Sequence, residues 1–236
     1  MTLLDAFIVY PWLKDILKEL SSDVLNRVIY RKYAQNEIII NECLENTTVF
    51  IILSGVTGTE QTTETGSQLV TRKAASGDVI GLSGALSGEP EFSSRIFAKT
   101  TVEAVLIPLD LARDSFGKYP HLAAEMTRRV INRLHGLIDL ISHCNNYPSY
   151  YALIYFLIVE YRIYSRSFPP EFGDPVEIIE RRADIASFLG VNYRSLQRCI
   201  TKLKHQGLLT VRSKKLYIDR KQYNNLRITL EEYAEQ

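Results

Sequence analysis

The stretch that decides the fold runs from Arg182 to Gly207 and reads RADIASFLGVNYRSLQRCITKLKHQG. It predicts two short helices joined by a tight turn. The first is expected from about Arg182 to Leu189, because its apolar residues have the spacing of one buried helical face: Ile185, Ala186 and Leu189. Gly190 then ends this helix, since glycine readily adopts the left-handed conformation that a sharp turn requires.

A second helix is expected after the turn, with Asn192 as its N-cap. Its inward face is predicted from apolar residues three to four positions apart: Leu196, Cys199 or Ile200, and Leu203. Basic residues recur every four positions on another face: Arg194, Arg198 and Lys202. This basic stripe suits the major groove of DNA, although a basic surface helix taken alone is more often only a solvated face.

The charge distribution favours the DNA interpretation. From Arg181 to Lys221 the chain has 11 basic residues against 2 acidic ones, a local net charge of +9. Because the whole chain is +1, the remaining residues carry −8, and such polarity is typical of a phosphate-binding surface. We therefore predict double-stranded DNA as a partner, with these contact residues: Asn192, Tyr193, Arg194, Ser195, Gln197, Arg198, Lys202, Arg182, Lys214 and Lys215.

Short apolar runs on both sides of these helices predict a small sheet. Leu208 to Val211 and Leu216 to Ile218 flank a polar tip, which is typical of a β-hairpin. Val176 to Ile179 is a further apolar run that is expected to join the same sheet. Together with the two helices, these strands predict a winged helix-turn-helix.

The first half of the chain, from about Asn26 to Ile107, predicts short strands separated by turns. The expected strands cover residues 38–40, 49–53, 56–62, 68–73, 79–80, 95–98 and 104–107. Regular short strands of this kind favour an antiparallel roll, jelly-roll-like in form. The expected fold class is therefore α+β, with an N-terminal antiparallel β-roll, a long dimerisation helix and a C-terminal winged helix-turn-helix.

The long helix is predicted from about Pro120 to Ser142, with proline in its first turn. Apolar residues repeat along it at intervals of 3, 4 and 3, the spacing of a coiled-coil seam: Ile131, Leu134, Ile138 and Ile141. The stripe either packs on the roll or joins two copies of the chain, and its sustained spacing favours a homodimer. Residues 145–148, Asn-Asn-Tyr-Pro, are expected to break the helix as a hinge.

The motif residues of the decisive stretch stand at Arg182, Ile185-Ala186, Leu189-Gly190-Val191, Ser195, Arg198 and 203–209. In this register they resemble the helix-turn-helix of the Crp/Fnr family of bacterial transcription regulators. The resemblance covers nearly the whole chain, and the segments GVNYRSL and LYIDRKQ look most like a YeiL-type subgroup. It implies a cyclic-nucleotide-binding-like β-roll sensor domain at 1–118, a dimerisation helix and hinge at 119–147, and a winged helix-turn-helix DNA-binding domain at 148–236.

The resemblance extends into the roll but weakens at its ligand site. Phe50 to Gly55 and Gly77 to Gly81 are similar to the family's lead into the ligand cassette. In cyclic-AMP receptors a Glu after that glycine binds the ribose, and an Arg-Ser pair holds the phosphate. Leu82 and Phe92-Ser93 stand at these positions here, and Arg133-Leu134 stands where a Thr-Ser pair reads adenine. The candidate effector pocket is therefore Gly81, Leu82, Phe92, Ser93, Arg133 and Leu134.

The residues of the ligand site, the cysteines and the histidines indicate which effectors and cofactors we expect. Leucine cannot accept a hydroxyl bond and phenylalanine cannot neutralise a phosphate, so we expect no cyclic AMP. An iron-sulfur member of the family has an N-terminal cysteine cluster, whereas the first half of this chain has only Cys43, so we expect no such cluster. The pair His143-Cys144 is read as structural and no metal is expected. Three alternatives stay open: an apolar or aromatic ligand, no ligand at all, and redox sensing through a cysteine.

The expected mode of DNA binding follows from a dimer. Two recognition helices related by a two-fold axis meet successive major grooves about 34 Å apart, which selects an inverted repeat. Arg194 and Arg198 are the residues expected to contact bases, because a guanidinium can donate two hydrogen bonds, one to O6 and one to N7 of guanine. Ser195, Lys202 and the wing lysines are expected on phosphates. The family often has Arg-Glu where this chain has Tyr193-Arg194, so the operator is expected to differ, and RNA polymerase is a further partner that the resemblance suggests.

Composition excludes several other classes of protein. The chain has 236 residues, 46% of them hydrophobic and 23% charged, which is ordinary for a globular protein of two domains. Three scattered cysteines suit a cytoplasmic protein, and no apolar run is long enough to predict a membrane span. No nucleophile, metal or phosphate-loop motif predicts an enzyme. The remaining alternative is a ligand-binding signalling module whose basic C-terminal domain binds another partner.

Overall fold

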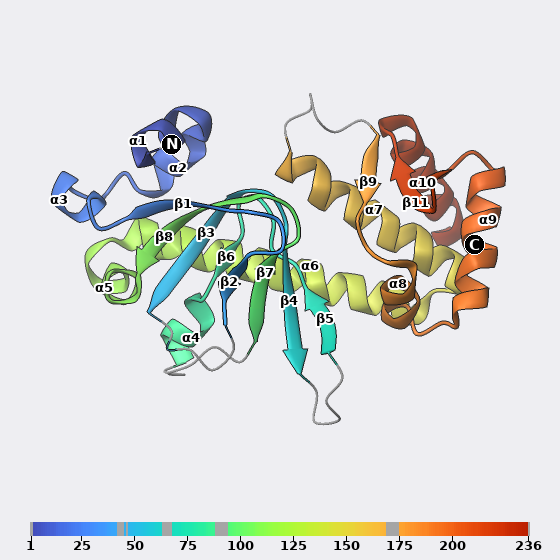
Figure 1. Ribbon diagram of the computed structural model, residues 1–236, viewed down its shortest axis with the longest axis horizontal. Helices are drawn as coiled ribbons and strands as arrows, with labels where there is room; N and C mark the ends of the chain where they lie inside the picture. The colour runs from blue at the N-terminus through green and yellow to red at the C-terminus, as the bar shows by residue number, and fades with distance from the viewer. Residues whose placement is uncertain are drawn as a thin grey trace. The chain divides into compact units, whose positions relative to one another are not determined.

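The computed structural model describes residues 2–41, 45, 47–62, 68–87, 94–168 and 175–235. The chain divides into two compact units, Met1–Leu134 and His135–Gln236 (Figure 1). Each unit has its own sheets, helices and hydrophobic core.

Unit 1 is built around eight short strands. They are β1 (Ile29–Tyr33), β2 (Ile38–Ile40), β3 (Thr48–Ser54), β4 (Thr57–Thr62), β5 (Gln68–Arg72), β6 (Val79–Ile80), β7 (Arg95–Ala98) and β8 (Val102–Pro108). Two four-stranded sheets result, with orders β1-β8-β3-β6 and β2-β7-β4-β5, and every pairing in them is antiparallel. The predicted antiparallel roll is confirmed, and its seven expected strands all form.

The helices of unit 1 lie before, between and after the strands. They are α1 (Leu3–Val9), α2 (Pro11–Ile16), α3 (Ser22–Leu25), α4 (Leu82–Ser87), α5 (Leu109–Lys118) and the first part of α6 (Pro120–Asn146). The strand β1 and the helices α1 to α5 were not predicted. In β1 the sequence IYRKY mixes apolar and charged residues on both faces, so no period-two pattern marks it.

The core of unit 1 follows from alternation along the central strands. Val49, Ile51 and Leu53 of β3 point to one side of the sheet and pack with helical residues such as Leu13 and Met126. The intervening residues Phe50 and Ile52 belong to a second cluster that also includes Ile40, Ile96 and Ala98 of the other sheet. One face of the first sheet is thus covered by helices and the other by strands, which makes β3 almost fully buried.

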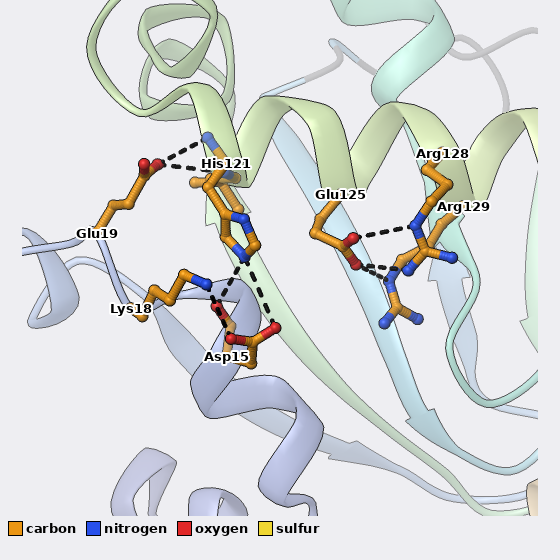
Figure 2. Close-up of polar contacts among 8 residues, drawn as sticks. Asp15, Lys18, Glu19, His121, Glu125, Arg128 and Arg129 are labelled. Carbon is orange, nitrogen blue, oxygen red and sulfur yellow. Dashed lines mark hydrogen bonds and ion pairs between the residues drawn. The ribbon is translucent and has the colours of Figure 1, made fainter.

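The start of α6 is tied to the N-terminal helices (Figure 2). The Glu19 carboxylate accepts hydrogen bonds from the backbone N–H of His121 at 2.9 Å and of Leu122 at 3.3 Å. It therefore caps free donors in the first turn of α6. Nε2 of His121 lies 3.0 Å from the carbonyl oxygen of Asp15, which adds a second link to the same segment.

Polar contacts continue along the next turns of α6. Arg128 donates two hydrogen bonds to Glu125, at 3.0 and 2.7 Å, and the guanidinium holds the pKa of the Glu125 carboxyl below its usual value. Arg129 donates a 2.7 Å bond to the carbonyl oxygen of Gly77 and lies over the ring of Trp12. The Arg129 contacts hold α6 against the rest of unit 1, whereas the Arg128–Glu125 pair lies within the helix.

Unit 2 holds the end of α6 and seven further elements. They are α7 (Ser149–Ser167), β9 (Val176–Ile178), α8 (Arg182–Phe188), α9 (Tyr193–His205), β10 (Thr210–Arg212), β11 (Lys215–Ile218) and α10 (Arg220–Ala234). The strands form a three-stranded antiparallel sheet in the order β10-β11-β9. The winged helix-turn-helix predicted from the sequence is present, and the apolar stretch from Tyr150 lies in the largely buried helix α7.

The break between α6 and α7 lies later than predicted. Asn145 and Asn146 do not break the helix but belong to it, and the Asn146 side chain donates a 2.9 Å bond back to the carbonyl oxygen of Ser142. The helix ends only before Tyr147 and Pro148, because a proline disfavours helical backbone in the residue that precedes it. The predicted end at Ser142 was therefore four residues early.

Candidate nucleic-acid interface

The turn between α8 and α9 forms as the sequence predicts. Gly190 has a φ of +63°, the left-handed conformation that L side chains rarely adopt. The N–H of Val191 bonds to the carbonyl oxygen of Ala186 at 3.0 Å, which satisfies the end of α8. At the start of α9 the Asn192 side chain accepts a 2.8 Å bond from the N–H of Ser195. The predicted glycine and asparagine roles are both confirmed by this geometry.

The inward face of α9 is apolar and packs within unit 2. Leu196, Ile200 and Leu203 are buried, whereas Cys199 is only partly so. Ile200 is therefore the core residue at the position where the sequence left two candidates. This packing on α7 and α8 holds the opposite face of α9 toward solvent.

The outward face of α9 carries the basic stripe. Arg194 and Arg198, one helical turn apart, are exposed and form no hydrogen bond or ion pair with any residue the structure describes. A shallow, open depression runs along this face, lined by Arg194, Gln197, Arg198, Thr201, Lys202 and His205. Tyr193, at the first position of the helix, is 53% exposed. The face thus presents free guanidinium groups beside an exposed ring.

Several other predicted contact residues have partners inside the protein. Arg182 of α8 donates a 2.9 Å hydrogen bond from Nη1 to Oε1 of Gln197 on α9. The Lys202 ammonium lies 4.1 Å from the centroid of the Tyr150 ring. These contacts join α9 to its neighbours. Sequence reasoning missed Tyr150, because no local pattern relates it to a lysine 52 positions later.

The wing is a tight hairpin. Ser213 and Lys214 connect β10 to β11 with φ values of 47° and 67°, the two positive values of a type I′ turn. Lys214 therefore stands exposed at the tip. Lys215, its neighbour, lies 2.7 Å from Oε1 of Glu177 on β9, and this carboxylate raises the pKa of the lysine. At the tip of the wing the Lys214 ammonium has no partner among the described residues, whereas the Lys215 ammonium is paired with Glu177.

A family model for the cyclic nucleotide-binding domain matches residues 30–119. The chain is 28% identical over 210 residues to the fumarate and nitrate reduction regulatory protein of Escherichia coli (strain K12), a match that covers 86% of this chain and 80% of that one. It is 27% identical over 210 residues to the anaerobic regulatory protein of Pasteurella multocida (strain Pm70), covering 86% and 74%.

Solved structures agree with these matches. FixK2 from Bradyrhizobium japonicum has a TM-score of 0.64 at 18% identity, with 84% of this chain and 96% of that chain covered. A transcriptional regulator of the Crp/Fnr family from Eubacterium rectale has a TM-score of 0.64 at 18% identity, covering 89% and 96%. The family model, the relatives and the solved structures together support a transcription regulator of the Crp/Fnr type. The relatives are regulators and not enzymes, which supports DNA-binding regulation as the function of this chain.

The structure describes the candidate effector pocket only in part. Phe92 and Ser93 lie outside the described residues. Leu82, at the start of α4, is only 2% exposed and packs in the core cluster beneath the first sheet. Nε of Arg133 donates a 3.0 Å bond to the carbonyl oxygen of Lys73, and Gly81 has a φ of +89°. Leu134 is 52% exposed and points away from the core.

The described cysteines are partly or fully buried, and His143 has a contact within the protein. Burial raises the pKa of the Cys144 thiol to about 12, and burial also raises that of Cys199. The ring of His143 stacks on Tyr155 with centroids 4.2 Å apart. Within the described ranges, no group of three or more potential ligands is placed to hold a metal ion, and no helix is long and apolar enough to cross a membrane. Cys43 lies outside these ranges.

Proposed function

We propose that this chain is a Crp/Fnr-type regulator that binds an inverted-repeat operator as a homodimer, through α9 and the wing, and responds to an effector other than cyclic AMP. The observation that carries the proposal is the pair Arg194 and Arg198. Both guanidinium groups are exposed on one face of α9, one turn apart, and neither is paired with a described residue. An arginine in this position can donate two hydrogen bonds to guanine, one to O6 and one to N7, in a major groove.

Contacts to the DNA backbone are assigned to the remaining polar residues of this surface. The Lys214 ammonium at the wing tip and the Ser195 hydroxyl at the start of α9 are expected to meet phosphates. The net charge of +9 between Arg181 and Lys221 attracts the duplex over a longer range. These contacts set affinity, while the arginines set sequence preference.

The dimer is proposed from the apolar stripe on α6. Ile131, Leu134, Ile138 and Ile141 are 44, 52, 51 and 43% exposed in the single chain, an unusual degree of exposure for four large apolar residues on one helix. Leu122 and Met126 of the same helix pack on the roll from a different face. The alternative that the stripe itself packs on the roll is thereby disfavoured, and a second copy of α6 is the occupant that we propose.

The effector is proposed to differ from cyclic AMP because the Leu82 side chain is buried in the core. A buried leucine side chain offers no acceptor to a ribose hydroxyl. An iron-sulfur cluster is not proposed either, since the chain has only three widely separated cysteines. The same proposal has three further parts. The chain divides at residues 118 and 147 into a sensor roll, a dimerisation helix and a DNA-binding domain. The protein is cytoplasmic, and RNA polymerase is a partner.

Salt dependence of binding to duplex DNA tests the proposal. The 236-residue chain is used to select duplexes from a random pool, and the affinity of a selected duplex is measured by fluorescence anisotropy at several KCl concentrations. We expect an inverted repeat, and a log affinity that falls linearly with log salt, with a slope of about 0.9 per phosphate contacted. Lys214→Ala should reduce the slope by about 1 per wing.

Lys14→Ala is the matched control, because it removes the same charge from an exposed site in unit 1. It should leave the slope unchanged. If Lys214→Ala and Lys14→Ala behave alike, the wing does not contact DNA. If no duplex is enriched at all, the basic domain serves the alternative function of binding another partner.

A further inference from the structure

The side chain of Gln197 is already used inside the protein. A glutamine that reads adenine must accept from N6 with its Oε1 and donate to N7 with its Nε2. In this protein Oε1 of Gln197 accepts the 2.9 Å bond from Arg182, and Nε2 is shielded from solvent. Gln197 therefore holds α8 and α9 together and does not offer its amide to a base.

The other carboxamide oxygens near α9 are also engaged. Oδ1 of Asn192 accepts from the N–H of Ser195 and caps the helix. Oε1 of Gln206, at the other end of α9, accepts from the Tyr150 hydroxyl. Every Asn and Gln between residues 181 and 221 thus has its acceptor oxygen occupied within unit 2.

The carboxylates around the interface are likewise paired, and α9 itself contains none. Arg181 bonds to Asp184 of α8 at 2.8 Å, and Lys215 and Tyr217 both bind Glu177 of β9. The remaining acid in the segment caps the following helix, where Asp219 accepts from the N–H of Gln222 at 2.7 Å. Each carboxylate of this segment therefore already has a partner within unit 2.

We infer that α9 offers bases no carboxylate and no free carboxamide acceptor, so that its half-site is recognised mainly by arginine donors at guanine and by an aromatic ring at thymine, and not at the amino groups of adenine or cytosine. The inference rests on the proposed DNA-binding role of α9 and specifies its base preference. Some groups of the face donate as well as accept and do not discriminate in this way: the hydroxyls of Tyr193, Ser195 and Thr201 and the imidazole of His205.

Base chemistry explains the expected preference. In the major groove guanine presents two acceptors, N7 and O6, which match the fork of Arg194 or Arg198. Thymine presents an acceptor and a methyl group, and the exposed ring of Tyr193 is suited to an apolar contact with that methyl. Cytosine presents only a donor there, which a row of donors cannot satisfy.

The test uses the unaltered protein and altered DNA. In a duplex selected from a random pool, each guanine of the half-site is replaced in turn by 7-deazaguanine, which lacks the N7 acceptor. Affinity should fall roughly 5- to 150-fold at the guanines that are read. Inosine is the matched control, because it keeps N7 and O6 and loses only a minor-groove amino group, and it should bind like guanine. Replacing thymine by uracil should weaken binding at the position that Tyr193 contacts.

Variants at the Arg182–Gln197 bond give an independent readout. Gln197→Ala and Arg182→Ala should both lower the melting temperature, and Gln197→Ala should weaken binding to all duplexes in the same proportion, leaving the base preference unchanged. A loss of preference at one adenine in Gln197→Ala, or full affinity for every 7-deazaguanine duplex, overturns the inference while leaving DNA binding intact. Failure to bind any duplex instead removes the proposed function, and the inference with it.

Discussion

The Lys202 ammonium lies 4.1 Å from the centroid of the Tyr150 ring, so a lysine of the recognition helix is held by the first turn of α7. The Tyr150 hydroxyl also donates a hydrogen bond to Gln206, at the end of the same helix. Two contacts from one side chain therefore set the position of the C-terminal half of α9. We expect Tyr150 to act on DNA binding through this positioning and not through contact with a base.

Replacing Tyr150 by leucine should loosen that end of α9. Loss of the cation–π contact and the hydrogen bond should lower the free energy of unfolding by about 1–2 kcal/mol. Tyr150→Phe keeps the ring under Lys202 and should lose only the hydrogen bond, about 0.5–1.5 kcal/mol. Urea unfolding measures both variants, and equal stability of the Tyr150→Leu and Tyr150→Phe variants would show that the ring does not hold Lys202.

Arg198 should contribute base recognition as well as charge. Arg198→Ala should cost ~1–3 kcal/mol of binding to the selected duplex, because a fork onto a base is lost. Arg198→Lys keeps the charge but loses the fork, so its salt slope should match that of the unaltered protein while its preference among half-sites weakens. Competition binding against single-base variants of the duplex checks this. Retention of the full sequence preference by Arg198→Ala would falsify the role given to Arg198.

The apolar stripe of α6 should determine the oligomeric state. Ile138→Glu places a charge in the middle of the proposed seam, where burial against a second copy costs several kcal/mol unless the charge is paired. Analytical ultracentrifugation should then show a monomer in place of a dimer. Ile228→Glu is the matched control, since Ile228 of α10 is 52% exposed and Ile138 is 51% exposed. A dimer that survives Ile138→Glu and Leu134→Glu alike would exclude the stripe as the interface.

Cyclic AMP should produce no saturable heat when titrated into the protein in a calorimeter. Leu82 lies in the core and offers no acceptor to the ribose, and each unpaired polar group of a buried ligand costs about 1–3 kcal/mol. Micromolar, saturable binding would overturn the argument from Leu82. The DNA affinity of the same preparation serves as the control for folded protein.

Local signals explain what the sequence predicted correctly. Gly190 and Asn192 act on neighbours within a few residues, and the strands of the roll alternate within single segments. The contacts that escaped prediction join distant residues. Glu19 caps α6 from 102 positions away, and Arg182 meets Gln197 across the turn. Residue type marked both Arg182 and Gln197 as DNA contacts, and only their geometry shows that Arg182 donates a hydrogen bond to Gln197.

The Cys144 thiol should be slow to react while the protein is folded. Burial raises its pKa to about 12 from an ordinary value of 9.0, so near pH 8 the reactive thiolate is about a thousandfold scarcer than in an unfolded chain. Alkylation by iodoacetamide, followed by peptide mass spectrometry, should label Cys144 slowly in buffer and rapidly in guanidinium chloride. Fast labelling in buffer would reopen redox sensing at this residue.

The same raised pKa makes stability depend on alkaline pH. The folded state holds the Cys144 proton more tightly than the unfolded state, so the contribution of this group is complete below about pH 9 and is lost as the pH rises toward 12. Cys144→Ala has no thiol to ionise and should show a shallower decline in the free energy of unfolding across that window. Parallel declines for the two proteins would mean that other groups, such as the buried tyrosines, govern the alkaline limit.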